Sequence, residues 1–504
     1  NTTASSNTAM GRYALAENTT GASNVAIGAY ALDAQQTTSN NTAVGYMAGT
    51  TITTGDENTA IGFKSLYTNQ AGDRNVAIGS WSLYDYCPSS NEDSYNVAIG
   101  YHCLGNTTVG HSNTAVGGLA LETNTTGTGN VAVGLRALQT SNSNNNVAIG
   151  LLAAYSLSTG DNSVAVGRYA LKNTSTGASN VAIGLNALMD NTTASDNIAV
   201  GSQAMESNQT GTRNVAVGHQ ALMNSTTSYN TGVGYGAAYT LTTGANNTAL
   251  GYAALYTTNA SNCTAVGYQA LDHNTTGNDN TAVGYEAMSA NTTGAQNTAV
   301  GKDALDANQT AHDNVAIGVG ALGVMNGGDG KNSAIGNYAG DAITTGASNT
   351  LLGYAAGGSI TTTNSNTAIG RDALATSAGA DACTALGKDA GKANTTGGSN
   401  TYVGCESGDL TTTGGSNTFV GYNASQGNTT GSSNVSLGYL AGNLGNGDNQ
   451  LHIARSNGGA GSASQWIVGD SSGNCYQGNN TSSWSTTSDE RLKKNIVDNN
   501  KGLA

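Results

Sequence analysis

The sequence predicts an all-β fold, a parallel β-solenoid or β-roll built from 26 short repeats. A five-residue core, for example NTAVG at residues 280–284, recurs 26 times between residues 7 and 438. Of the 25 intervals between successive copies, 20 are 17 residues long. A unit of this length cannot bury a hydrophobic core alone, so neighbouring units must stack.

Each core predicts one short strand followed by a corner. Numbered from its Asn, the repeat has Thr, Val or Ile at position 2 in all copies but Ser333, an aliphatic residue at position 4, and Gly at position 5 in every copy. β-branched residues in period-two alternation favour a strand. We expect position 4 to point into the coil and position 3, usually Ala, to point outward. The Gly marks a corner with positive φ or a close backbone approach.

The rest of the repeat predicts a second short strand and a turn. Position 8 is small and position 9 is usually Leu or Met, as at Ala287 and Met288, and Thr-Thr-Gly at positions 13 to 15 supplies the turn. One coil should therefore hold two or three very short strands.

Repeats that lack a large residue at position 9 carry an aliphatic one at position 12. The pairs are Gly49 with Ile52, Ala154 with Leu157, Ala238 with Leu241, Gly340 with Ile343 and Gly357 with Ile360. Both positions should face one interior, where a lost side chain leaves a costly void. Gly408 with Leu410 and Gly442 with Leu444 show the same pattern displaced by one residue. Gly391 and Ser425 have no such partner.

Two irregular intervals interrupt the array. The 18-residue interval before residue 332 precedes copies that mostly have Gly at position 9, so we expect Leu-type repeats over 1–330 and Gly-type repeats over 331–440. The 21-residue interval contains residues 84–88 (YDYCP), with the only Pro, and predicts a bulging loop.

A thin coil is expected to need partners. A small residue kept at position 3 on a supposed outer face indicates tight packing against another chain, and symmetric homo-oligomers are the usual solution. Because position 3 becomes Leu351, Tyr402, Phe419 and Ser436 towards the C-terminus, we expect the packing there to loosen or widen.

Composition and charge narrow the classes of partner that this chain is expected to bind. A net charge of −14, spread thinly, argues against nucleic-acid binding, and no apolar run is long enough for membrane insertion. The six cysteines form no CxxC pair, and those in the repeats fall at position 8 (Cys103), position 1 (Cys263 and Cys383) and position 6 (Cys405), so no disulfide framework is expected. The chain opens in mid-pattern without an initiator Met, so we expect a piece of a longer protein.

The repeated core resembles the head repeats of trimeric autotransporter adhesins and the same repeats in bacteriophage tail fibres. The resemblance covers residues 7 to about 440 and implies a left-handed β-roll in a homotrimer. Residues 465–470 (QWIVGD) and 484–496 (WSTTSDERLKKNI) resemble the entry to the C-terminal intramolecular chaperone of phage tail fibres and endosialidases. This implies a connector over 441–487 and the start of a chaperone domain over 488–504.

In that family the chaperone cuts itself off after folding. The resemblance implies attack by the hydroxyl of Ser488 on the carbonyl of Thr487, with Lys493 as general base, which needs burial to lower the lysine pKa. The alternative is a polar segment with Ser488 as a helix N-cap. Either way the protein is not expected to be a turnover enzyme.

Other residues suggest binding rather than catalysis. Tyr recurs at position 6 and could form an outward stripe for sugar rings, with Tyr235, Tyr252, Tyr268 and Tyr285 as its core; tolerated surface tyrosines are the plainer interpretation. The acidic turns at 55–58 and 277–280 could hold Ca²⁺, but solvated turn residues are the preferred interpretation. No cofactor site, metal-ligand spacing, Ser-His-Asp set or phosphate loop emerges.

Three functions follow from these patterns. The first is a phage tail fibre in the virion tail that binds a host cell-surface glycan or protein and is matured by cleavage before Ser488. The second is a bacterial cell-surface adhesin. The third is an ice-binding solenoid with stacked threonines, which the breaks at positions 13 and 14 disfavour.

Overall fold

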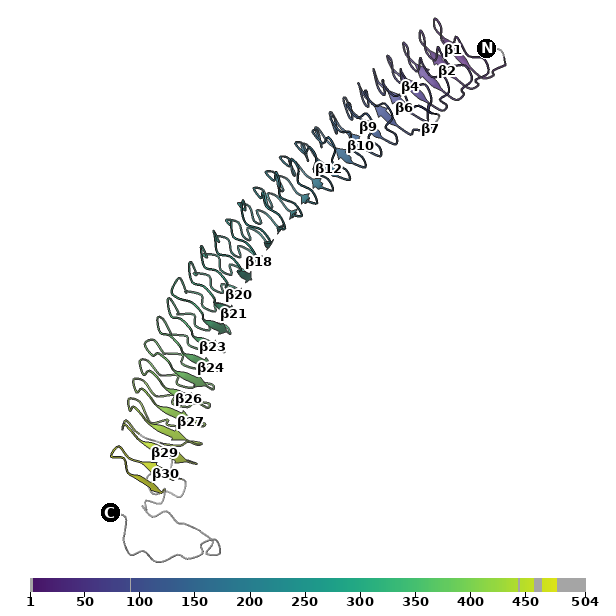
Figure 1. The fold of residues 1–504 in the computed structure, drawn as a ribbon. Helices are drawn as coiled ribbons and strands as arrows, with labels where there is room; N and C mark the ends of the chain where they lie inside the picture. Colours follow the sequence, from purple (N-terminus) through teal and green to yellow (C-terminus); the bar gives the residue numbers. More distant parts are fainter. Residues whose placement is uncertain (1–2, 91, 443–444, 457–464, 478–504) are drawn as a thin grey trace, which may run out of the picture. The chain divides into compact units, whose positions relative to one another are not determined.

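The computed structural model describes residues 3–90, 92–442, 445–456 and 465–477, which form strands and turns and no helix. The chain divides into two compact units, Asn1–His312 and a second that begins at Asp313. Figure 1 shows that each unit is a stack of coils whose strands follow one another in chain order. Each unit is a parallel β-solenoid, as the sequence predicts.

The strands of the first unit are β1 (Thr8–Met10), β2 (Val25–Ile27), β3 (Thr42–Val44), β4 (Thr59–Ile61), β5 (Gly72–Asp73), β6 (Val76–Ile78), β7 (Glu92–Asp93), β8 (Val97–Ile99), β9 (Thr114–Val116), β10 (Val131–Val133), β11 (Val147–Ile149), β12 (Val164–Val166), β13 (Val181–Ile183), β14 (Ile198–Val200), β15 (Val215–Val217), β16 (Thr231–Val233), β17 (Thr248–Leu250), β18 (Thr264–Val266), β19 (Thr281–Val283) and β20 (Thr298–Val300). Those of the second are β21 (Val315–Ile317), β22 (Ser333–Ile335), β23 (Thr350–Leu352), β24 (Thr367–Ile369), β25 (Thr384–Leu386), β26 (Thr401–Val403), β27 (Thr418–Val420), β28 (Val435–Leu437), β29 (Leu451–Ala454), β30 (Gln465–Gly469) and β31 (Cys475–Gln477).

Each regular coil contributes one three-residue strand, at repeat positions 2 to 4. Within a unit, neighbouring coils pair in parallel and in register, so that Thr281 faces Thr264 on one side and Thr298 on the other. The predicted second strand around position 9 is absent from the described coils. Positions 7 and 9 turn the chain instead, with left-handed φ values such as 62° at Tyr30 and 48° at Leu32.

The predicted orientation of the strands is wrong by one residue. The middle residue of the core strands from β2 to β28, at position 3, is buried, while positions 2 and 4 face outward: Ala282 is fully buried and Leu250, at position 4, is 46% exposed. At Gly232, a position-3 residue, an added Cβ would lie 3.0 Å from Leu222, the position-9 residue of the preceding coil. Because that leucine already fills the interior, only a small residue fits beside it.

This correction explains the large position-3 residues near the C-terminus. Tyr402 and Phe419 are fully buried, and a Cβ added to Gly391 or Gly408 would lie 2.4 Å from the Tyr402 ring. The aromatic side chains therefore fill space left by glycines at position 9. Gly391 does have a compensating residue, and it lies one coil further along the chain.

The pairing of positions 9 and 12 is confirmed for Gly49 with Ile52, because a Cβ on Gly49 would lie 3.1 Å from Ile52 and the isoleucine is fully buried. The displaced pair of Gly408 with Leu410 is wrong, since Leu410 is 47% exposed and Thr411, at position 12, is buried instead. Leu444 lies outside the described residues.

Buried asparagines at position 1 link the coils. Oδ1 of Asn24 accepts a hydrogen bond from the backbone N–H of Asn41 at 2.9 Å, and Oδ1 of Asn41 accepts from that of Asn58 at 2.8 Å. The Nδ2 group of Asn41 donates to the carbonyl of Gly55 at 2.9 Å. These bonds satisfy backbone groups that burial would otherwise leave without partners.

The invariant Gly at position 5 meets both predicted requirements. Gly284 has a φ of 146°, a region that side chains disfavour, and an added Cβ would lie 2.4 Å from the carbonyl oxygen of Gly301. The coils therefore approach one another closely at this corner, and any side chain there would push them apart.

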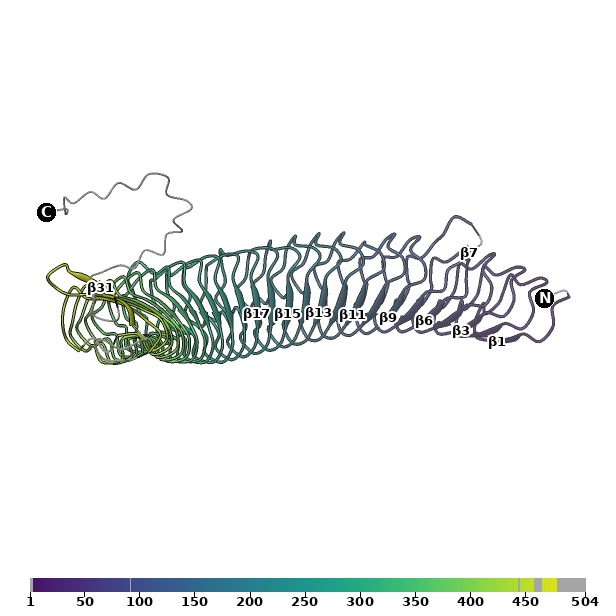
Figure 2. The same cartoon turned by 90° about the horizontal axis from the view of Figure 1, so that it is seen from below.

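The 21-residue interval forms the predicted bulge, which Figure 2 shows extending beyond the neighbouring coils near β7. Tyr86 is fully buried, and a Cβ on Gly72 would lie 2.5 Å from its ring. The chain then leaves the coil and returns at β7, which pairs in parallel with β5.

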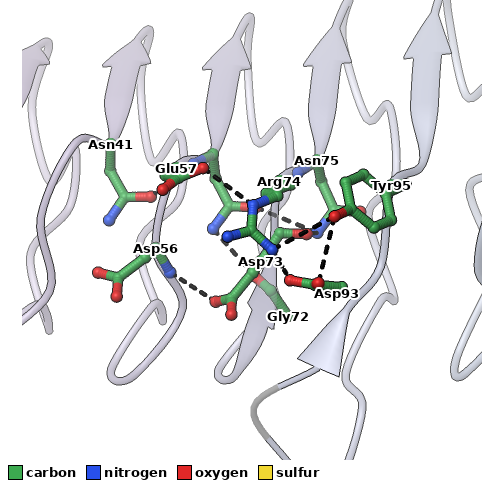
Figure 3. Close-up of polar contacts among 10 residues, drawn as sticks. Asn41, Asp56, Glu57, Gly72, Asp73, Arg74, Asn75, Asp93 and Tyr95 are labelled. Atoms are coloured by element: carbon green, nitrogen blue, oxygen red, sulfur yellow. Dashed lines mark hydrogen bonds and ion pairs between the residues drawn. The ribbon is translucent and has the colours of Figure 1, made fainter.

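Arg74 ties the bulge to the preceding coil (Figure 3). Its guanidinium contacts Glu57 at 3.0 Å, forms an ion pair with Asp93 and lies 3.4 Å from the Tyr95 hydroxyl, which donates to Asp93 at 3.2 Å. These groups are exposed, so the cluster positions the loop more than it stabilises the coil.

Towards the end of the described part of the second unit, the strand pairing changes from parallel to antiparallel. β29 pairs in parallel with β28, whereas β30 pairs antiparallel with β29 and β31 with β30. The turn between the last two strands is held by Asp470, whose Oδ1 accepts from the backbone N–H groups of Ser472 at 3.0 Å and Asn474 at 2.9 Å. Reversing the pairing covers the open edge of the last parallel strand.

Candidate functional site

The tyrosines predicted as a stripe lie side by side on the first unit. Ring centroids are 5.2 Å apart between Tyr235 and Tyr252, 5.2 Å between Tyr252 and Tyr268, and 5.1 Å between Tyr268 and Tyr285, with ring planes within 10° of parallel. His219 stacks on Tyr235 at 5.2 Å. The tyrosines are between 42% and 48% exposed.

The mutual stacking limits what this stripe can bind. Because each ring is covered by its neighbours along the column, the tyrosines present edges and hydroxyls outward, whereas a sugar ring stacks on an aromatic face. At the end of the column the Nζ of Lys302 lies 5.8 Å from the Tyr285 centroid and 3.2 Å from Asp303. The geometry favours a stabilising role, since aromatic pairs contribute about 0.5–1.5 kcal/mol each.

A second aromatic run near the N-terminus was not predicted. It alternates between positions 6 and 7, so inspection of one repeat column misses it; reading both columns together would have found it. Its rings, with successive centroids 5.3 to 6.2 Å apart, are Tyr13, Tyr30, Tyr46, Phe63, Trp81 and Tyr101.

Trp81 does not stack flat on either of its neighbours in this run. Its ring plane is tilted by 59° to Phe63 and by 48° to Tyr101, and it meets His102 edge-on at 88°. Beside it lies a cleft of about 250 Å³ lined by Lys64, Trp81, Tyr84 and His102.

The outward face of the strands is a third surface feature. The aliphatic side chains at position 4 stack in register within each unit, and several are more than a third exposed: Ile61, Ile99, Ile149, Ile183, Val217, Leu250, Ile317, Ile335, Leu352, Leu386 and Leu437. Thr, Val or Ile at position 2 lies beside them. Each unit therefore carries a continuous apolar column along its strands.

In the two acidic turns, carboxylates accept hydrogen bonds from a neighbouring coil of the same stack. Oδ1 of Asp56 accepts a hydrogen bond from the backbone N–H of Ser39 at 2.7 Å, and Oδ1 of Asp279 accepts from Nδ2 of Asn262 at 3.1 Å. Among the described residues, no group of three or more His, Cys, Asp or Glu side chains is arranged to hold a metal ion.

Threonine hydroxyls in the turns also donate hydrogen bonds to the backbone of the next coil. The hydroxyl of Thr292, at position 13, donates to the carbonyl of Gln309 in the next coil at 2.9 Å, and Thr275 donates to that of Thr292 at 2.8 Å. Hydroxyls that bond the backbone are less available for an ordered water layer, so ice binding remains the weakest hypothesis.

All six cysteines are free thiols, of which Cys103, Cys263 and Cys383 are buried. Cys263 replaces the ladder Asn and donates to the carbonyl of Gly277 at 3.3 Å. The residues implicated in self-cleavage, Thr487, Ser488 and Lys493, lie outside the described residues.

Searching the described part of the chain for a helix long and apolar enough to cross a membrane gives none. Comparison of the chain with protein-family models, with curated proteins and with solved structures gives no match.

Proposed function

We propose that this chain forms the rod of an extracellular phage tail fibre, which associates with copies of itself and carries or forms the part that binds a host cell-surface glycan or protein. The observation that carries the proposal is the apolar column on the outward face of the strands. Proteins that act alone in water rarely expose contiguous apolar patches larger than a few hundred Å².

A partner for this column must match its repeat. The side chains recur once per coil, at the spacing of paired strands, roughly 4.8 Å. A second copy of the chain has this period by construction and offers the same apolar surface, so it can cover the column along its length. Self-association thus rests on positions 2 and 4, and no longer on the buried alanines at position 3. Three copies are proposed because of the sequence resemblance.

Solution mass tests this proposal. We expect the chain to run as a trimer at micromolar concentration in light scattering or native mass spectrometry. Replacing Val266, Val283 and Val300 together by Glu should reduce the mass while circular dichroism still reports β-structure. A matched control, Thr276, Thr293 and Thr310 to Glu, charges exposed positions of the same three coils and should leave the oligomer intact. A stable wild-type monomer would defeat the proposal.

The proposed maturation step is tested separately. The product of the full gene should end at Thr487 by mass spectrometry, and Ser488→Ala should leave it uncut. An uncut product with a complete chaperone would remove self-cleavage while leaving the rod in place. A bacterial cell-surface adhesin would use the same rod and interface; a membrane-anchoring domain encoded after this chain would establish that alternative.

A further inference from the structure

The cleft beside Trp81 arises from a local change in two repeat columns. Lys64, Trp81 and His102 occupy position 7 in three consecutive coils, and Tyr84 occupies position 10. Tyr84 stacks on Tyr67, its counterpart in the preceding coil, with centroids 5.1 Å apart and planes 5° from parallel. The column of position-10 rings therefore forms one wall of the cleft and the position-7 residues form the other.

Gly105 ends the position-10 column and makes room for the base of the cleft. A Cβ at Gly105 would lie 2.3 Å from Nδ1 of His102, so the imidazole occupies the place of the missing side chain. Nδ1 of His102 also lies 3.4 Å from a carboxylate oxygen of Glu122, and the other oxygen of Glu122 accepts a hydrogen bond from Gln139. The imidazole of His102 therefore packs between Gly105 and Glu122.

Neither neighbour of Trp81 along the run stacks flat on its indole. In the column from Tyr235 to Tyr285, planes within 10° of parallel cover each face. The tilts of 59° and 48° at Trp81 prevent that, although the side chain is half-buried. A half-buried indole that lines a cleft, and on which neither neighbour stacks flat, is suited to stacking against the apolar face of a ring.

Lys64 supplies a positive charge at the same cleft. Its Nζ lies 5.1 Å from the Tyr67 centroid and 5.7 Å from that of Phe63, and it forms no ion pair with a described residue. Cation–π contacts hold the ammonium group near the rings without neutralising it. A carboxylate would therefore find an available partner here, and hydrogen bonds to charged groups are the stronger class.

We propose that this cleft binds a single pyranose unit that carries a carboxylate, with the sugar face on Trp81 and Tyr84 and the carboxylate at Lys64. The volume of about 250 Å³ is below the roughly 300–1,000 Å³ of pockets that enclose drug-sized ligands, which suits one ring. The proposal deepens the adhesion function above by naming a ligand class, and it rests on that function only for its biological setting.

Tryptophan fluorescence can follow the binding directly. The chain has three Trp residues, so Trp466→Phe with Trp484→Phe leaves Trp81 as the only reporter. Titration of this variant with sodium glucuronate should give saturable quenching. Methyl glucoside, which has the ring but no charge, should bind roughly tenfold more weakly, and acetate, which has the charge but no ring, should not saturate.

Two substitutions, Lys64→Gln in the reporter background and Trp81→Phe in the otherwise wild-type chain, separate the contribution of the charge from that of the ring. Lys64→Gln should weaken glucuronate roughly tenfold and leave methyl glucoside unchanged. Lys302→Gln is the matched control: it also removes a lysine above an exposed ring, but at a column without a cleft, and should change neither. Trp81→Phe, followed by calorimetry in the otherwise wild-type chain, keeps an aromatic ring in place and should weaken both sugars. Unchanged thermal unfolding verifies that each variant folds.

Glucuronate affinity that is equal for the reporter and its Lys64→Gln derivative would overturn the proposal, as would quenching by acetate alone or no saturation at millimolar glucuronate. These outcomes differ from failure of the rod: a chain that forms trimers and adheres to host cells, yet ignores these probes, loses the cleft assignment and keeps the proposed function.

Discussion

The ring of Tyr402 occupies the space above Gly391, the position-9 residue of the preceding coil, because a Cβ on that glycine would lie 2.4 Å from the ring. Leu374, one coil earlier, has a φ of 50° against 57° at Gly391, so left-handed backbone does not by itself require glycine in this column. The glycine is required by volume. A large residue has moved from one interior position to another, and the interior remains filled.

Gly391→Leu should destabilise the second unit by overpacking, by about 1–3 kcal/mol. Tyr402→Ala should cost about 3–5 kcal/mol through the cavity that it leaves. Because Leu at position 9 with Ala at position 3 is the usual combination in this chain, the double variant should be more stable than the sum of the two losses predicts, with a coupling of about 0.5–3 kcal/mol. Urea unfolding of all four proteins measures this coupling; strictly additive losses would contradict shared occupancy.

Asn280→Ala should cost about 1–3 kcal/mol for each buried group left unpaired. Oδ1 of Asn280 accepts from the backbone N–H of Asn297 at 2.9 Å, and its Nδ2 donates to the carbonyl of Gly294 at 2.7 Å. Asn280→Ser should cost less, because Ser163, at the same repeat position, accepts the corresponding bond from the backbone N–H of Asn180 in the next coil at 3.2 Å. Thr293→Ala, at an exposed turn position, is the control; thermal unfolding that ranks Ala and Ser equally would count against the ladder.

Gly284→Ala should be among the least tolerated single changes. The substitution combines a φ of 146° with a Cβ placed 2.4 Å from a backbone oxygen that cannot move independently of its coil. Such backbone strain alone costs about 1–3 kcal/mol, and the clash separates two coils. Limited proteolysis should show new cleavage near residue 284, and a variant as protease-resistant as the wild type would rule out this close approach.

Thiol labelling of the native protein at pH 8 should distinguish two classes of cysteine. Burial raises the pKa of the Cys103 thiol to about 12 and that of Cys263 to about 11, so both stay protonated and shielded, while Cys87 and Cys475 are exposed. Mass spectrometry should find rapid modification at Cys87 and Cys475 and protection at Cys103 and Cys263 until the chain is unfolded. Rapid native labelling of Cys103 would show that its coil is open.

The period and the strand positions could be predicted because they depend on spacing, and the close approach at Gly284 because an invariant glycine has few other causes. The direction of the strand side chains could not, since alternation gives two faces without saying which is inside. Hydrophobicity favoured Val283, yet the coil is so narrow that Ala282 fits the interior and Val283 does not. The clue lay in Gly391 at position 9 and Tyr402 at position 3 of the next coil. These two residues depart together from the usual Leu and Ala, which indicates that both positions share the interior.

The candidate site was predicted less completely. The column from Tyr235 to Tyr285 was visible because its members share one repeat position, although their mutual stacking was not. The cleft at Trp81 was missed because its walls come from two columns, and because it depends on Gly105 leaving a gap that His102 fills. Concavity of this kind follows from side-chain directions, which repeat numbering does not encode.

The ladder from Asn24 to Asn41 and Asn58 joins each coil to its successor through the same pair of groups. Removing one whole repeat from within such a run would bring together two surfaces that are already complementary. The number of coils in the solenoid could therefore change by unequal recombination between repeats of the gene, with no new interface to evolve. Selection could thus change the number of coils in a unit without changing the cross-section of each coil.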